Sequence, residues 1–119
     1  MKTTKNTLSK KYSLKSTKLI DQLFINGQSI ISYPVRLVYI HVEDLPQTFQ
    51  VSFSVPKKKF KHAVDRNRIK RLMRESFRLQ QHKIKTQNIA MMWLYMNHKM
   101  PNKKQIDLCI AEIIEKLNQ

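Results

Sequence analysis

The sequence predicts an α+β protein in which a single layer of helices covers a four-stranded, mostly antiparallel sheet. Segments with helical apolar spacing and runs of β-branched or aromatic residues follow each other in the order α-β-β-β-α-β-α. A length of 119 residues corresponds to one domain. A hydrophobic content of 41% is enough for a modest core and argues against global disorder. We therefore expect one domain, 1–119, in which the polar and basic residues 1–15 form a flexible arm.

Three segments have the apolar spacing of amphipathic helices. The first is expected over Thr17–Asn26, with Ser16 as its N-cap and Gly27 as a residue of positive φ after its last turn. The second is expected from about residue 62 to residue 81. The third begins after Asn102 and buries an apolar stripe that includes the single cysteine, which should be a structural thiol. The stripe consists of Ile106, Cys109, Ile110, Ile113, Ile114 and Leu117.

Four segments rich in β-branched and aromatic residues predict the strands. Residues 29–33 and 35–42 are separated by Pro34, which favours a bend or an edge position. Residues 49–55 alternate strictly between apolar and polar side chains, so this strand should have one buried face. Residues 87–96 have the length and aromatic content of a fourth strand.

The segment 57–78 concentrates positive charge on a helix that can still pack against a core. It carries ten of the 23 lysine and arginine residues of a chain whose net charge is +15. A solvated helix face usually mixes charges of both signs, but this segment contains only two carboxylates. At 3.6 residues per turn, a row of cations recurs every four residues: Arg66, Lys70, Arg74 and Arg78. Because arginine binds phosphate oxygens in pairs and stacks on bases, we expect this helix to bind nucleic acid.

The other partner of a strongly basic protein would be an anionic membrane. The longest apolar run, about residues 89–96, is far below the roughly 20 residues that span a bilayer. The basic N-terminal residues are not followed by the apolar stretch of a signal peptide. We therefore expect a cytoplasmic protein without a membrane partner.

The chain shows no pattern typical of a catalytic or cofactor site. Its eight carboxylates are scattered, and its four histidines lack metal-ligand spacing. One glycine cannot build a glycine-rich phosphate loop, and one cysteine cannot form an internal disulfide or a zinc site. We expect no catalytic residue, metal site or cofactor in the protein itself, and no small-molecule substrate.

Residues 63–78 closely resemble the signature of the bacterial ribonuclease P protein subunit. That signature reads Ala-Val-x-Arg-Asn-Arg-x-Lys-Arg followed by Arg-Glu, in a basic helix after a strand, and the match here is contiguous. The resemblance implies a left-handed βαβ crossover around the basic helix. It also implies a subunit of an endoribonuclease whose RNA, with Mg²⁺, removes the 5′ leader of precursor tRNA. The implied partners are ribonuclease P RNA and precursor tRNA.

The resemblance also implies two sets of RNA-binding residues. The first would contact the catalytic RNA through the matched helix residues Arg66, Asn67, Arg68, Lys70, Arg71 and Arg74. To these the charge pattern adds Lys57, Lys58, Lys59, Lys61 and Arg78. The second would form a cleft for the leader between the first helix and the sheet: Ile20, Phe24, and Val38 or Tyr39. Ile20 stands where the family usually has an aromatic residue.

Three other readings of the same charge remain open. A ribosomal or other structural RNA-binding protein would have a similar size and composition. A DNA-binding regulator could use the basic helix for recognition, but a strand stands where a helix-turn-helix needs its preceding helix. An enzyme acting alone would cleave RNA without any added RNA subunit.

Overall fold

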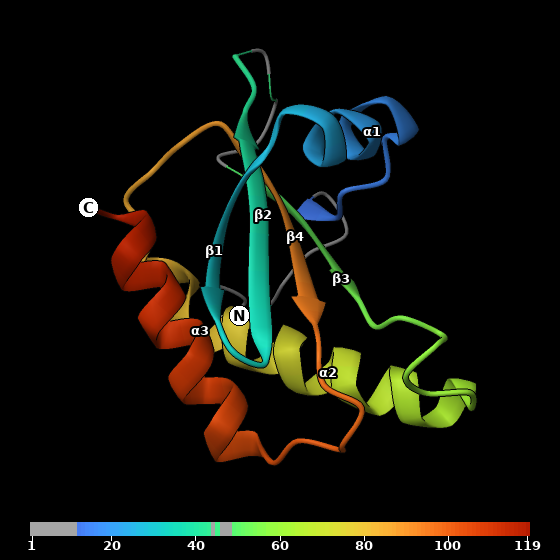
Figure 1. The fold of residues 1–119 in the computed structure, drawn as a ribbon. Helices are drawn as coiled ribbons and strands as arrows, with labels where there is room; N and C mark the ends of the chain where they lie inside the picture. Colours follow the sequence, from blue (N-terminus) through green and yellow to red (C-terminus); the bar gives the residue numbers. More distant parts are fainter. Residues whose placement is uncertain (1–11, 44, 46–48) are drawn as a thin grey trace, which may run out of the picture.

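The computed structural model describes residues 12–43, 45 and 49–119, and its element order matches the predicted order (Figure 1). The elements are α1 Thr17–Asn26, β1 Gln28–Ser32, β2 Val35–His41, β3 Phe49–Ser54, α2 Ala63–Gln80, the short 3₁₀ turn η3 Gln81–Lys83, β4 Ile89–Tyr95 and α3 Lys103–Leu117.

The four strands form one mixed sheet in the order β1-β2-β4-β3. Pairing is antiparallel between β1 and β2 and between β2 and β4, and it is parallel between β3 and β4. The parallel pair is connected through α2. In Figure 1, where β3 and β4 point down, β4 lies to the left of β3 and α2 lies behind the sheet. This is the left-handed crossover that the resemblance implies, against the general preference for right-handed connections.

Helices cover both faces of the sheet, so the predicted single layer of helices is wrong. Leu37 and Trp93, which are paired across β2 and β4, belong to the larger core with α2 and α3. Val38 and Met92, the next pair along, belong to a second core with Leu23 of α1. Central strands with apolar residues at successive positions need cover on both sides, and α1 supplies it on the second face.

Helix α1 has the predicted bounds and N-cap, but Gly27, which follows its last residue, has a different role from the predicted one. The hydroxyl of Ser16 accepts a hydrogen bond from the Leu19 amide at 3.3 Å. Gly27 has φ −71° and ψ 153°, which is extended backbone, so the prediction of a positive φ is wrong. A Cβ atom at Gly27 would lie 2.2 Å from the Leu23 carbonyl oxygen and 2.9 Å from Val38 Cγ1. Glycine is therefore required at this position because the Leu23 backbone and the Val38 side chain lie too close to residue 27 to leave room for a Cβ atom.

The residues just before α1 pack against the sheet. Ser13 forms a parallel bridge with Val51, and the Leu14 amide donates to the Val51 carbonyl at 2.9 Å. The Tyr12 ring stacks on Phe49 with centroids 4.9 Å apart, and Leu14 is buried. The expected arm 1–15 therefore does not include residues 12–14, and its remainder up to residue 11 lies outside the described residues.

Candidate nucleic-acid interface

Helix α2 packs one side on the sheet and presents the other side to solvent. Its buried residues are Ile69, Met73, Ser76 and Phe77, and the Phe77 ring lies 5.8 Å from that of Trp93. Ser76 accepts a hydrogen bond from Gln80 at 2.9 Å, so its hydroxyl is satisfied in the interior. Several polar side chains of the motif lie on the exposed side of the helix: Asn67, Arg68, Arg71 and Arg74.

Arg66, the first arginine of the motif, is bound to its own chain. Its Nη1 donates to the carbonyl oxygens of Phe60 at 2.7 Å and Lys61 at 2.9 Å. No side chain caps the first turn of α2 at His62, so Arg66 connects the helix to the loop before it. It is half-buried, whereas a residue that only contacts RNA would be free to stay exposed.

The basic loop before α2, residues 57–61, is anchored by contacts of its own as well as by Arg66. Phe60 is buried, and its ring centroid lies 6.1 Å from that of Tyr95. The Lys59 amide donates to the Pro56 carbonyl at 3.2 Å, which closes a tight turn. The lysines of this loop are all exposed and extend the positive surface beyond the start of α2: Lys57, Lys58, Lys59 and Lys61.

The row predicted at four-residue spacing turns around the helix as it runs along it. Arg66 and Lys70 are half-buried, and Arg74 is exposed. The Arg74 guanidinium lies 5.6 Å from the centroid of the Phe53 ring in β3, within cation–π range. Of this row, Arg74 therefore lies against β3, and Arg78 follows one turn later near the end of the helix.

Arg78 differs from the rest of the row because it forms an ion pair. Its Nη2 lies 2.6 Å from Glu75 Oε1. The hydrogen bond from Arg78 lowers the pKa of the Glu75 carboxyl, and the charges of Arg78, Arg71 and Arg74 lower it further. Glu75 thus stays ionised within the basic surface and offsets part of the Arg78 charge.

The residues expected to form a leader cleft do not all lie on one surface. Val38 is buried under α1 with the half-buried Ile20 beside it, and Phe24 of α1 is 60% exposed. Tyr39 pairs with Met91 and packs with the core of the opposite face. Its hydroxyl donates to Gln28 Oε1 at 2.9 Å. The structure therefore places Val38 on the face that carries α1, and Tyr39 is not brought together with the other residues of this set.

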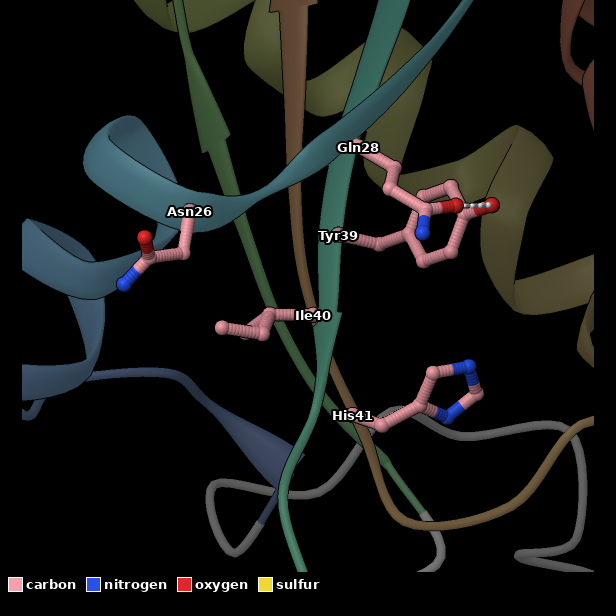
Figure 2. A pocket seen from close by; sticks show the side chains of 5 residues that line it. All are labelled: Asn26, Gln28, Tyr39, Ile40 and His41. Carbon is pink, nitrogen blue, oxygen red and sulfur yellow. Dashed lines mark hydrogen bonds between the residues drawn. The ribbon is translucent and has the colours of Figure 1, made fainter.

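Sequence reasoning did not single out a small hollow at the β1–β2 edge (Figure 2). It has a volume of about 220 Å³ and lies where β2 extends past the first pair of β1, Gln28 with Tyr39. Figure 2 shows Ile40 pointing toward the α1 side while Tyr39 and His41 point to the other. The lining residues are Asn26, Gln28, Tyr39, Ile40 and His41. They offer amide, phenol and imidazole groups but no lysine or arginine.

A second residue that the prediction omitted is Arg36. It shares a strand face with Val38, two residues away on β2, and is half-buried. A single cation inside the apolar run 35–42, in phase with the α1-facing positions, is the signal that could have identified it.

The described part of the chain contains no group of three histidine, cysteine or carboxylate side chains placed to hold a metal ion. Cys109 is buried, as expected, with its Sγ 3.6 Å from the Tyr33 carbonyl oxygen. Within the same described ranges, no helix is both long and apolar enough to cross a bilayer.

The fold and the exposed basic side of α2 define a class: small α+β proteins with a basic helix inserted between two parallel strands. The family model described as Ribonuclease P matches residues 8–118 of this chain. The chain therefore belongs to the Ribonuclease P family.

Curated relatives agree with this assignment. Proteins named "Ribonuclease P protein component" include one from Porphyromonas gingivalis, 41% identical over 76 residues that cover 63% of this chain and 56% of the relative. Another, from Alkaliphilus metalliredigens, is 31% identical over 104 residues that cover 87% of this chain and 91% of the relative. The match thus spans about half the length of the Porphyromonas gingivalis relative and most of the Alkaliphilus metalliredigens one.

Solved structures share the fold. The RNase P protein of Staphylococcus aureus superimposes with a TM-score of 0.75 at 22% identity, over 88% of this chain and 94% of that one. The RNase P protein from Thermotoga maritima gives a TM-score of 0.74 at 15% identity, over 87% of this chain and 96% of that one. At these identities the likeness establishes the fold.

Proposed function

We propose that this chain is the protein subunit of a ribonuclease P ribonucleoprotein. In this role it binds the catalytic RNA and the 5′ leader of precursor tRNA, and it assists the endonucleolytic removal of that leader. The observation that carries the proposal is α2, whose buried stripe fixes it on the sheet while Asn67, Arg68 and Arg71 point outward. The family assignment supports the same role.

The two surfaces divide the work in this proposal. The exposed side of α2 and the lysine loop neutralise phosphates of the catalytic RNA. The face that carries α1 receives the leader, with Phe24 as the exposed aromatic side chain available for stacking on a base. Two polyanions repel each other, so a protein that contacts both lowers the electrostatic cost of bringing substrate to catalyst.

The chemistry of cleavage is assigned to the RNA. Mg²⁺ bound with that RNA supplies charge stabilisation for the attacking and leaving oxygens. We propose no metal site in the protein, whose side chains act by binding and positioning. Replacing one exposed arginine should therefore weaken assembly and leave the cleavage step of the assembled complex unchanged.

The test is cleavage of a precursor tRNA by a bacterial ribonuclease P RNA at low Mg²⁺, with and without this chain. We expect the chain to stimulate cleavage strongly at low Mg²⁺ and weakly at high Mg²⁺, where free cations already screen the phosphates. No stimulation at any Mg²⁺ concentration would contradict the proposal.

Two controls separate the alternatives. Competition binding between ribonuclease P RNA and ribosomal RNA should favour the former, and equal affinity would favour a general structural RNA-binding protein. Incubation of the chain with precursor tRNA alone should give no cleavage, and cleavage there would point to an enzyme acting alone.

A further inference from the structure

Arg36 lies on the sheet face that carries α1, at the end of β2 remote from that helix. The register places Arg36 in one row across the sheet with Ile31 of β1, Leu94 of β4 and Ser54 of β3. Val38, which α1 covers, stands two residues further along β2, about 7 Å away at strand spacing. The Arg36 row is therefore the first one beyond the cover that α1 provides.

This row is open to a partner. Ile31 at its β1 end is 50% exposed, and Leu94 and Ser54 are only half-buried. The carboxylate that reaches β1 is Glu112, which accepts a hydrogen bond from the Ser32 hydroxyl at 2.5 Å. Ser32 is the neighbour of Ile31 and points to the opposite face of the sheet, so Glu112 does not neutralise Arg36.

The Arg36 guanidinium has a hydrogen-bond donor without an acceptor. Its Nε is buried and has no acceptor among the described residues. No ion pair within the same residues involves Arg36 either. The two Nη groups of Arg36 are not among the buried unpaired atoms and make no hydrogen bond to the described residues, so they reach solvent and can meet an acceptor from outside the chain. The planar guanidinium fork suits the two oxygens of a phosphodiester.

The row also leads toward the basic helix. Ser54 lies two strands from Arg36, about 10 Å at the spacing of neighbouring strands. Phe53, the residue before Ser54, points to the opposite face of the sheet, and the Arg74 guanidinium lies over its ring there. A strand of RNA that leaves the α1 region can therefore meet Arg36 and then the Ser54 hydroxyl, and it reaches Arg74 after passing around the β3 edge.

We propose that Arg36 binds a backbone phosphate of single-stranded RNA crossing the open part of this sheet face, and that this strand is the 5′ leader of the precursor. The inference rests on the proposed function and adds a phosphate contact beyond the α1 cleft. Its chemistry does not depend on the base, so Arg36 contributes affinity for any leader long enough to reach it.

The experiment uses the full-length chain reconstituted with ribonuclease P RNA. Equilibrium dissociation constants are measured for precursor tRNAs with leaders of increasing length and for the same tRNA without a leader. For Arg36→Gln we expect roughly tenfold weaker binding of the long-leader precursor. Its salt dependence should flatten by about 0.7 on a log–log plot, the value for one phosphate of a single strand. Affinity for the leaderless tRNA and for the RNA subunit should not change.

Two further variants serve as controls, one for the loss of a positive charge elsewhere and one for the charge of Arg36 itself. Lys104→Gln removes an exposed cation from α3, on the other side of the sheet, and should leave all these constants unchanged. Arg36→Lys keeps the charge and the packed stem, so it should restore part of the long-leader affinity.

The possible results separate cleanly. Equal losses for long-leader and leaderless tRNA, or for the RNA subunit, would assign Arg36 to folding or to another RNA and overturn the inference. Long-leader affinity unchanged in Arg36→Gln would overturn it as well. If the wild-type chain itself fails to stimulate cleavage, the proposed function fails first, and that is seen before any variant is made.

Discussion

At the scale of single residues, Gly27 fixes the distance between α1 and β2. Replacement of Gly27 by alanine would place a methyl group 2.2 Å from the Leu23 carbonyl oxygen. Relief requires loss of the 2.9 Å hydrogen bond from the Gly27 amide to that oxygen, or a shift of α1 away from Val38. We expect Gly27→Ala to lower the free energy of unfolding by about 1–3 kcal/mol, the usual cost of overpacking. Urea denaturation measures it, with the neighbouring exposed Asn26→Ala as a control of small effect.

A second residue-scale prediction concerns Tyr95, whose side chain is buried. Burial raises its pKa to about 12, with smaller contributions from Tyr33 and Cys109. Its hydroxyl donates to the Lys99 carbonyl at 2.6 Å, which also requires the neutral form. The folded protein therefore holds this proton more tightly than the unfolded chain, in which tyrosine titrates near pH 10.

The sign of the pH dependence follows. The contribution of Tyr95 is complete below about pH 10 and is lost as the pH rises toward 12, by about 3 kcal/mol at most. Denaturant titrations across that alkaline range should show the fall, and Tyr95→Phe should reduce it. A variant with the same alkaline loss as the wild type would show that other groups cause it.

At the scale of elements, the arginines of α2 have different roles: some are available to bind RNA and others stabilise the fold. Arg71 is exposed and has no hydrogen bond or ion pair to the described residues, whereas Arg66 donates to two loop carbonyls. Arg71→Ala should flatten the salt dependence of RNA binding by about one unit and leave stability unchanged.

Arg66→Ala should do more than weaken RNA binding. Removal of two hydrogen bonds, one of them partly buried, should also cost about 1–3 kcal/mol of folding free energy and loosen the lysine loop. Thermal or urea unfolding of the two variants, Arg66→Ala and Arg71→Ala, measured without RNA, distinguishes their effects on stability. Equal stability of the two variants would mean that the Arg66 contacts are not maintained in solution.

At the scale of the whole molecule, local patterns predicted the elements but not how they face one another. The bounds of α1 and the burial of Ile69 and Met73 follow from spacing alone, because a helix sets its own apolar face. The position of α1 on the second face does not, since it depends on pairing between β2 and β4. A one-residue change of register would exchange Val38 and Tyr39 between the faces.

The candidate site shows the same division. The basic character of α2 could be predicted from composition, and its motif pointed to the family. The duty of Arg66 could not, because its acceptors are backbone carbonyls that any sequence would carry. Arg36 was missed because one cation in an apolar strand attracts notice only when the neighbouring strands show that its row is uncovered.

The place of β4 in the sheet has a consequence for how the chain folds. β3 is made before β4, yet within the described residues its only sheet partners are β4 and the bridge at Ser13. During synthesis, β1 and β2 can form a hairpin at once, while β3 and α2 stay without their central partner until residue 95 has left the ribosome. Such non-local pairing slows folding. A nascent chain in that interval exposes the apolar side of β3 and α2, and with it a strongly cationic surface that any nearby RNA can hold.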